Sequence, residues 1–444
     1  METYLKGCRD ALKGHMRNSF GQLHVVLGNE ACDIDSMVSA LTFAYFLSKT
    51  VDSGKAVVPM LNIPRAELPL RSDNTFLLRE SGLSQDYLLF RDEVDLHSLK
   101  NLTITLVDHN VLPVADRTLE NAVVEVIDHH RLDRTLSTSC QVTTETVGSC
   151  ATLITERIVQ KAPDLLDQQV AQLLYGAIIT DCVNMAPEAG KVTPKDSQYV
   201  ILLESRFPKL PPRSILFQSL QNAMFDVSGL TTEQMLLKDM KTVSGGDLRL
   251  AVSVIYITLE TFLQREYLQQ EFCEFCHKHN YNVVVAMTIS FIDNKEPFRQ
   301  IAVYSSSTRN RDEVIKALEK ARSPHLNLTP MSSPYTDLKA YVQGNVLASR
   351  KKVLPIISDF LKDLERKMEQ LEDLELEDEC SQEQGDSQQY CEDTVMEEDS
   401  GVPPTPMNSL VEGCPLDNGL PRINTDMLVE KVSKIISEED DDGP

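Results

Sequence analysis

The sequence is poor in basic residues and has no long apolar run. Its 444 residues include 43 Lys and Arg against 67 Asp and Glu, which gives a formal net charge of −24. Because a long-range negative potential repels polyanions, extended binding to nucleic acid is disfavoured. No stretch approaches the ~18 consecutive apolar residues of a membrane-spanning helix, so we expect no membrane span.

Signals for export and for disulfide formation are also missing. The first residues, METYLKGCRDALKGH, lack the apolar segment of a secretory signal peptide. The ten cysteines have no disulfide-framework spacing, and no prenylation cysteine stands at the end of the sequence. These absences predict a protein that is kept reduced in the cytoplasm or the nucleus.

One cysteine cluster has the spacing of a covalent haem site. Cys273, Cys276 and His277 form a C-x-x-C-H sequence, but such attachment requires export. The surrounding segment, 258–279, has an apolar residue at most helical turns, so we expect one amphipathic core helix there. Its apolar aromatic positions are Phe262, Tyr267, Phe272 and Phe275.

The acidic excess is concentrated at the C-terminal end. From Arg366 onward, 23 Asp and Glu stand against 5 Lys and Arg. Such a composition cannot bury a core, so residues 363–444 are predicted to form an acidic, mostly disordered tail. Within it, residues 425–438 have the pattern of a short amphipathic helix, which is a candidate for binding a protein partner. A purely solubilising tail is the plainer alternative.

Strand-like and helix-like patterns alternate over the first ~200 residues, which is typical of a parallel sheet with crossover helices. The predicted strands end at GN, ML, VDHN and IDHH, and helices are expected near 36–49, 151–160 and 168–180. We therefore predict an α/β catalytic domain over residues 1–205. A Pro-rich linker at 206–213 and a smaller α+β domain at 214–362 complete the expected folded part.

Acidic and imidazole side chains follow these predicted strands where each strand ends. They are Asp33 and Asp35 in CDID, Asp108 in VDHN, and Asp128, His129 and His130 in IDHH, with Asp181 in the later TDCVN. Parallel strands bring their carboxyl ends to one edge of a sheet, so these groups should converge. Crowded carboxylates raise one another's pKa values unless cations neutralise them. Hard carboxylate oxygens favour Mg²⁺ or Mn²⁺ over zinc.

Each residue also has a plainer role when it is considered alone. Asp35 could cap the helix that begins near Ser36, and a lone histidine after a strand is more often a surface or a hydrogen-bonded residue than a metal ligand. The joint occurrence of three such motifs directly after strands favours the metal site.

The motifs also carry a family resemblance. CDIDS, VDHN, IDHH and TDCVN resemble the four motifs of the DHH phosphoesterase superfamily, and KDMK with SRKKVLP resembles the second, DHHA2-like domain of family II pyrophosphatases and exopolyphosphatases. The nuclease branch has a GGGH element that this sequence lacks. GNEACDIDS and the acidic tail are most similar to the exopolyphosphatase-like branch that includes the animal Prune proteins. The resemblance extends from about residue 20 to about residue 360.

The resemblance implies a role for each motif residue. The two metal ions, Mg²⁺ or Mn²⁺, would be bound by Asp33, Asp35, Asp108, Asp181 and His129, with Asp108 and Asp181 bridging both. His130 would contact the substrate phosphate, and Asp128 would orient its neighbours, so that Asp128, His129 and His130 form the catalytic triplet. Pyrophosphatases have a metal-binding histidine where this chain has Asn29. An amide oxygen is a weaker and harder ligand, which predicts weaker binding and a shift from Mn²⁺ towards Mg²⁺.

The predicted reaction is hydrolysis of phosphoanhydride bonds in short-chain polyphosphate. Two metal ions lower the pKa of a bound water, which can then attack the terminal phosphorus. Lys241, Arg350 and Lys351 of the second domain would bind the phosphates, although SRKK alone could be an exposed basic turn. A phosphodiesterase acting on cyclic or linear nucleotides is one alternative. Another is an interaction scaffold with weak catalysis, whose tail the resemblance links to a nucleoside diphosphate kinase.

Overall fold

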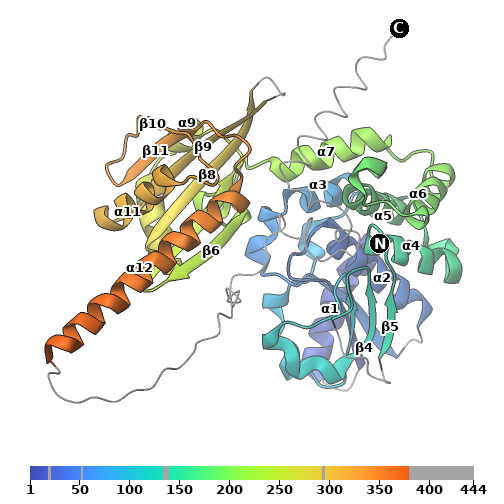
Figure 1. Cartoon of the computed structure of the whole chain (residues 1–444). Coiled ribbons are helices and arrows are strands. Elements are labelled where there is room, and N and C mark those ends of the chain that lie inside the picture. Colours follow the sequence, from blue (N-terminus) through green and yellow to red (C-terminus); the bar gives the residue numbers. More distant parts are fainter. Residues whose placement is uncertain (19–21, 52–53, 134–139, 293–295, 380–444) are drawn as a thin grey trace, which may run out of the picture. The chain divides into compact units, whose positions relative to one another are not determined.

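The computed structural model describes residues 1–18, 22–51, 54–133, 140–292 and 296–379 (Figure 1). They form two compact units, and the first ends at Ser228. The predicted linker at 206–213 lies inside this first unit, where it connects α6 (Pro194–Arg206) to α7 (Arg213–Phe225). Because α7 packs against α3 and α5, the boundary falls after α7 and not before it.

The first unit is built on a five-stranded sheet in the order β2-β1-β3-β4-β5, and every neighbouring pair is parallel. The strands are β1 (Gln22–Leu27), β2 (Lys55–Met60), β3 (Leu102–Val107), β4 (Val123–Asp128) and β5 (Gln141–Thr144). The predicted parallel sheet is confirmed. The short strand β5 was not predicted, because its four residues are half-buried or exposed and show no apolar run.

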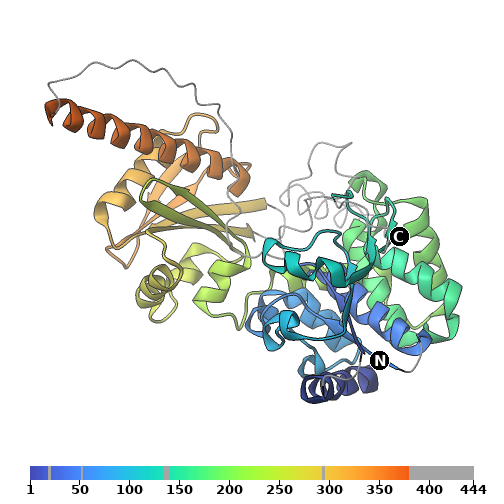
Figure 2. The ribbon, with the colours of Figure 1, turned by 90° about the horizontal axis from the view of Figure 1, so that it is seen from below.

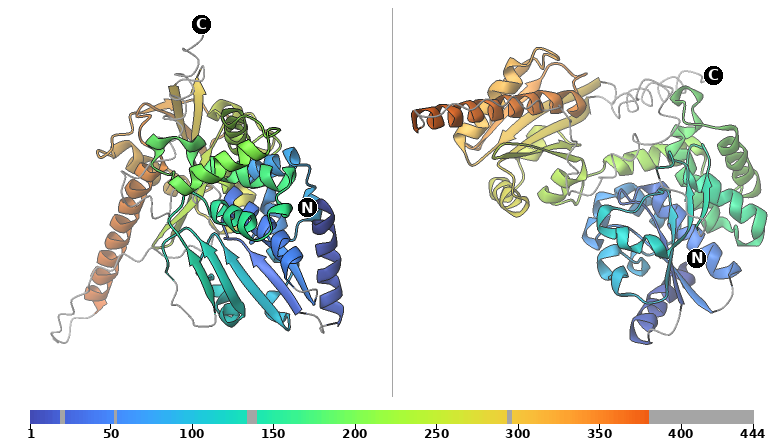
Figure 3. Two further views of the ribbon diagram at one scale, coloured as in Figure 1. Left: turned by 90° about the vertical axis from the view of Figure 1, so that its right-hand side faces the viewer. Right: turned by 60° about the horizontal axis from the view of Figure 1, so that its bottom comes forward.

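Helices cover both faces of this sheet. They are α1 (Glu2–Asn18), α2 (Ile34–Thr50), α3 (Ser72–Glu80), α4 (Cys150–Lys161), α5 (Gln168–Asp181), α6 and α7. Helices α2, α4 and α5 pack together on one face of the sheet, over Val26, Val107 and Ile127. Leu27 and Leu106 belong to the hydrophobic core on the other face. Helix α1 lies along the edge strand β2 (Figure 3). Both sheet faces are therefore buried, as a parallel sheet requires.

Short 3₁₀ helices make up much of the connecting chain in this unit. They are η1 (Arg65–Leu70), η2 (Gln85–Tyr87), η3 (Arg91–Glu93), η4 (Leu96–Ser98), η5 (Val114–Ala122), η6 (Pro163–Leu165), η7 (Val183–Met185) and η8 (Pro187–Ala189).

The second unit contains a six-stranded mixed sheet in the order β10-β11-β9-β8-β7-β6, in which only β7 and β8 run parallel. Its strands are β6 (Met240–Gly245), β7 (Leu248–Ile255), β8 (Val283–Ile292), β9 (Glu296–Tyr304), β10 (Leu328–Met331) and β11 (Leu338–Gln343). Its helices are α8 (Thr232–Lys238), α9 (Leu259–Leu263), α10 (Leu268–His279), α11 (Thr308–Lys320) and α12 (Arg350–Glu379). Helix α12 runs along one face of the sheet (Figure 2), with Val353, Ile357 and Leu361 in the core. The predicted α+β second domain is confirmed.

The single helix predicted over 258–279 is wrong. The segment forms two helices, α9 and α10, and Tyr267 between them has a left-handed backbone (φ 58°) and a 75% exposed side chain. Phe262, Phe272 and Phe275 are buried as predicted.

Helix α12 extends to Glu379, so the first part of the predicted tail is helical. The helix predicted at 425–438 lies outside the described residues. None of the helices that the structure describes is both long and apolar enough to cross a membrane.

Candidate metal centre

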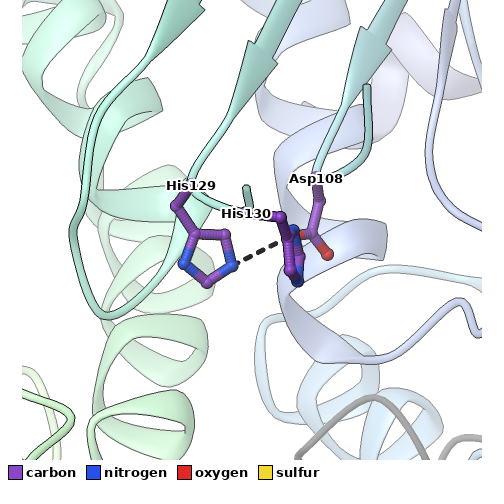
Figure 4. Close-up of side chains that lie close together, drawn as sticks. All are labelled: Asp108, His129 and His130. Carbon is purple, nitrogen blue, oxygen red and sulfur yellow. Dashed lines mark ion pairs between the residues drawn. The ribbon is translucent and has the colours of Figure 1, made fainter. Parts of the chain in front are cut away.

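The carboxyl ends of β3 and β4 bring three predicted site residues together (Figure 4). Asp108 directly follows β3, and His129 and His130 directly follow β4. One potential ligand atom from each of the three lies within 4.8 Å of the others. The convergence predicted from the strand ends is therefore present for this group.

Asp108 has an unusual backbone for a residue with a side chain. Its φ of +60° turns the chain sharply at the end of β3, and its carboxylate is only 2% exposed. Non-glycine residues with positive φ are uncommon, and they occur often at functional sites. The amide nitrogen of Asn29 donates to Asp108 Oδ2 at 2.9 Å.

The imidazole of His129 is oriented by a backbone carbonyl. Its Nδ1 lies 2.9 Å from Val147 O, and because a carbonyl can only accept, Nδ1 carries a proton. In the neutral ring Nε2 then holds the lone pair, and it lies 3.2 Å from Asp108 Oδ1. Two electron-rich atoms at that distance repel unless a proton or a metal ion lies between them.

Asp35 is held by the beginning of α4. Its carboxylate accepts the backbone N–H groups of Cys150 at 2.5 Å and of Ala151 at 2.7 Å, and its exposed fraction is 2%. Helix N-termini stabilise anions through such unpaired N–H groups and the helix dipole. Asp35 Oδ2 also lies 3.7 Å from His129 Nε2.

Asp33 has the capping role that the sequence suggested for Asp35. Its side chain accepts the N–H of Ser36 at 3.0 Å, so Asp33 is the N-cap of α2 and Asp35 lies within the first turn. The carboxyl groups of Asp33 and Asp35 thus approach the centre from one helix start.

Asp181, the last residue of α5, completes the acidic group. Burial raises the pKa of its carboxyl well above the usual range, and the nearby charges of Asp35, Asp33 and Asp108 raise it further. Burial also raises the pKa of Asp108 well above the usual range, and the charge of Asp35 raises it further. The hydrogen bond with His129 partly offsets this rise. In the part of the chain that the structure describes, Asp108 Oδ1 and Asp181 Oδ2 are buried without a hydrogen-bond partner. Divalent cations fit this donor set, because they supply the missing positive charge.

Asp128 and His130 form a hydrogen-bonded pair beside this group. Asp128 Oδ1 accepts from His130 Nδ1 at 2.7 Å, and Oδ2 accepts from the Asn110 amide at 2.6 Å. Burial acts to raise the pKa of Asp128, but the hydrogen bond from His130 and its charge lower it to about 2. In return, Asp128 raises the pKa of His130 against the effect of burial. Asp128 therefore orients His130, and Asn110 is a site residue that sequence reasoning missed.

Asn29 contacts its neighbours through both atoms of its amide. Besides the bond to Asp108, its Oδ1 accepts the N–H of Cys32 at 2.9 Å. The predicted metal ligand thus acts as a hydrogen-bond donor to another predicted ligand, and its oxygen still has a second lone pair.

The loop that carries Asn29 and Asp33 is held by two further residues that the sequence did not reveal. The buried Arg71 guanidinium donates to Ala31 O at 2.7 Å, and Asn74 donates to Cys32 O at 2.7 Å. Neither has a sequence signal, because their partners are backbone carbonyls far away in the chain.

The three predicted phosphate-binding cations belong to the second unit. Arg350 is 11% exposed and forms an ion pair with Asp239 at 2.6 Å, with a further bond to the Asp239 carbonyl. Lys241 is half-buried in β6, and Lys351 is exposed in the first turn of α12. Arg350 is thus fixed in its own domain, whereas Lys351 is accessible.

Comparisons with known proteins give matches to both domains of the chain. Residues 24–178 match the DHH family, N-terminal domain, and residues 218–360 match the DHHA2 domain. Exopolyphosphatase PRUNE1 of Homo sapiens is 48% identical over 445 residues, which cover 98% of this chain and 97% of that protein. A putative exopolyphosphatase of Schizosaccharomyces pombe is 29% identical and covers 77% of this chain and 92% of its own length.

The name of a more distant relative includes a metal ion, manganese. The manganese-dependent inorganic pyrophosphatase of Methanocaldococcus jannaschii is 32% identical over 169 residues, which cover 36% of this chain and 48% of that protein. Both domain matches occur in the expected order, and the human relative is similar over nearly the whole length. The chain therefore belongs to the DHH–DHHA2 phosphoesterase family, in the group that includes the PRUNE1 exopolyphosphatases.

Proposed function

We propose that this protein is a metal-dependent exopolyphosphatase that hydrolyses phosphoanhydride bonds of short-chain inorganic polyphosphate. The observation that carries the proposal is the buried cluster of Asp35, Asp108, Asp181 and His129, in which two carboxylate oxygens have no hydrogen-bond partner among the described residues. The similarity to proteins named exopolyphosphatase over 98% of the chain supports the choice of substrate.

The cluster would hold two divalent cations. The proposed ligands are Asp33, Asp35, Asp108, Asp181 and His129, with Asn29 as an amide neighbour. When bound, the cations supply a water of lowered pKa and neutralise phosphate charge. We propose Mg²⁺ as the ion used, because four carboxylates and a single imidazole form a hard ligand set, and Mn²⁺ as a substitute.

The chain's own residues would prepare the reaction at the phosphate. The raised pKa of His130 keeps its ring protonated further towards neutral pH, so it can donate a hydrogen bond to a phosphate oxygen. Asp128 orients that ring, and the carbonyl of Val147 keeps His129 Nε2 available as a ligand.

The second domain would supply cations for the polyphosphate chain. Lys241 and Lys351 are proposed to bind phosphates as point charges. Arg350 is proposed to contribute from its ion pair with Asp239, which fixes its guanidinium in one orientation.

The test is phosphate release from tripolyphosphate with Mg²⁺ or Mn²⁺, measured for wild type and for Asp108→Ala. We expect release to fall on the order of a thousandfold or more, because loss of the Asp108 carboxylate would remove a proposed metal ligand and several kcal/mol of metal-based stabilisation. Asp164→Ala, at an exposed aspartate of η6, is the matched control and should keep wild-type activity.

Two outcomes would contradict the proposal. Equal release by wild type and Asp108→Ala would show that the cluster is not the active centre. Release from a cyclic nucleotide, with none from tripolyphosphate, would assign the same centre to a phosphodiesterase.

A further inference from the structure

Asp196 is a buried carboxylate outside the proposed ligand set. It lies in the first turn of α6, it is 0% exposed, and it forms a capping box with the N-cap residue Thr193. Asp196 Oδ2 accepts the Thr193 N–H at 2.8 Å and the Thr193 hydroxyl at 2.6 Å. The capping box consists of the first of these bonds and of the Asp196 N–H, which donates to the Thr193 hydroxyl at 3.4 Å.

Two further hydrogen bonds connect Asp196 to a distant part of the chain. Oδ2 also accepts the N–H of Gly148 at 2.8 Å, and Oδ1 accepts the hydroxyl of Thr152 at 2.6 Å. Both partners belong to residues 147–152, which we call the 147–152 segment. These two contacts are not part of the capping box, and they connect the start of α6 to the 147–152 segment.

The 147–152 segment in turn holds two proposed metal ligands through backbone atoms. Val147 O accepts from His129 Nδ1, and the N–H groups of Cys150 and Ala151 bind the Asp35 carboxylate. A displacement of this segment would therefore rotate the His129 ring and release the Asp35 oxygens together.

The segment also packs tightly against the residue that follows Asp181. A Cβ atom built at Gly148 would lie 2.4 Å from Cys182 Sγ and 2.4 Å from Lys191 O. Real Cβ atoms do not approach that closely, so the backbone at Gly148 lies directly against the end of α5. Three ligand-bearing elements thus meet the 147–152 segment.

We propose that Asp196 is a positioning residue of the metal centre, which acts by fixing the 147–152 segment. The inference rests on the proposed metal ligands. It assigns a role to a carboxylate that touches neither a metal ligand nor the substrate, and it couples α6 to the geometry of His129 and Asp35.

The test is Mn²⁺ affinity of the full chain, measured by isothermal titration calorimetry without substrate. Asp196→Ala should weaken Mn²⁺ binding about 10- to 100-fold, the usual effect of removing a residue that orients metal ligands. Thr152→Val, which removes only the hydroxyl bond to Asp196, should weaken binding in the same direction by a smaller factor. Thr152→Ser keeps the hydroxyl and should restore wild-type affinity.

A matched capping box in the second unit provides the control. Thr231 and Gln234 form the same reciprocal pair at the start of α8. Gln234→Ala should lower the thermal unfolding midpoint slightly and leave Mn²⁺ affinity unchanged.

The outcomes separate this inference from the proposed function. Wild-type affinity in both Asp196→Ala and Thr152→Val, even with lowered unfolding midpoints, would overturn the positioning role alone. If Asp196→Ala does not fold, the Thr152 pair decides the question. A wild-type protein that binds no Mn²⁺ would overturn the metal centre itself, and this role with it.

Discussion

At the scale of single residues, two carboxyl groups of the metal centre, those of Asp108 and Asp181, bind protons more tightly than usual when no metal is bound. The pKa values of Asp108 and Asp181 are raised well above the usual range by burial and by neighbouring carboxylates. In the unfolded chain both groups lose their protons near pH ~4. The folded state binds more protons above that pH, so the stability of the metal-free protein should fall as pH rises from there towards the raised pKa values.

Because a metal ion displaces the protons from the Asp108 and Asp181 carboxyl groups, we predict that Mn²⁺ binding releases protons. Titration calorimetry in two buffers of different ionisation enthalpy should give different apparent enthalpies, because the released protons are taken up by the buffer. Release should decrease as pH rises, and Asp181→Asn should reduce it. An apparent enthalpy that is the same in both buffers would contradict the raised pKa values.

Asn29 allows a second prediction at this scale. Its amide donates to Asp108 Oδ2 at 2.9 Å, so Asn29→Asp would place a carboxylate against a carboxylate. When both carboxylates are ionised, like charges 2.9 Å apart repel by about 6 kcal/mol with an effective dielectric constant near 20. We expect a lower unfolding midpoint without metal and a larger rise on addition of Mn²⁺ than in wild type. Asn29→Ala removes the donor without adding charge, and an identical metal response in both variants would disprove the repulsion.

The same residues show how much of the site the sequence revealed. Asp108, His129 and His130 could be predicted because each directly follows a strand, and parallel strands end at one edge. Arg71 and Asp196 could not, because their contacts to the site are with the Ala31 carbonyl and the Gly148 N–H, which are backbone atoms 40 and 48 residues away. A pattern along the chain contains no information on such pairs.

At the scale of elements, the close approach of Gly148 to α5 predicts a sharp response to one added methyl group. Gly148→Ala should lower the free energy of unfolding by roughly 1–3 kcal/mol, the usual cost of overpacking. It should also weaken Mn²⁺ binding, because the backbone that holds Asp35 must shift. Chemical denaturation and titration calorimetry measure the two effects. Gly7→Ala, in an exposed turn of α1 with no atom within 4 Å, should be neutral or stabilising. Equal behaviour of the two variants would contradict the packing argument.

Element boundaries were less predictable than element types. The apolar periodicity of 258–279 identified the buried faces of α9 and α10 but not the break between them. Tyr267 adopts its left-handed backbone in a segment without glycine or proline, the residues that normally signal such a turn. The break between α9 and α10 therefore has no such signal in the sequence.

At the scale of the whole molecule, the length of α12 determines where the tail can be removed. Leu361 is 1% exposed, and Glu365 accepts the backbone N–H of Gly246. The domain end predicted at residue 362 would cut this helix within its packed part. A chain truncated after residue 379 should therefore keep hydrolysis and stability, whereas one truncated after residue 361 should unfold at a lower temperature. Equal unfolding midpoints of the two truncated chains would contradict this.

The truncation after residue 379 also separates catalysis from partner binding. The resemblance described for the sequence links the tail to a nucleoside diphosphate kinase, which predicts that removal of residues 380–444 abolishes binding in a pull-down with the purified kinase. Binding that persists in the shorter chain would place the contact in the folded domains. The two-domain α/β architecture itself was predictable from the alternation of patterns, but the boundary after α7 depends on its packing against α3 and α5.

The atoms that hold Asp35 and His129 belong to the backbone of residues 147, 150 and 151. Every amino acid supplies the carbonyl at residue 147, and every amino acid except proline supplies the N–H at residues 150 and 151. These positions can therefore change identity, within the limits of their buried volume, without loss of the contacts to the ligands. Residues 147, 150 and 151 are fully buried and should tolerate apolar substitutions of similar size, whereas Gly148 and Asp196, which set the path of the chain, should tolerate few substitutions of any kind. In a saturation library screened for metal binding, most substitutions at Gly148 and Asp196 should be lost, and apolar substitutions of similar size at residues 147, 150 and 151 should be retained.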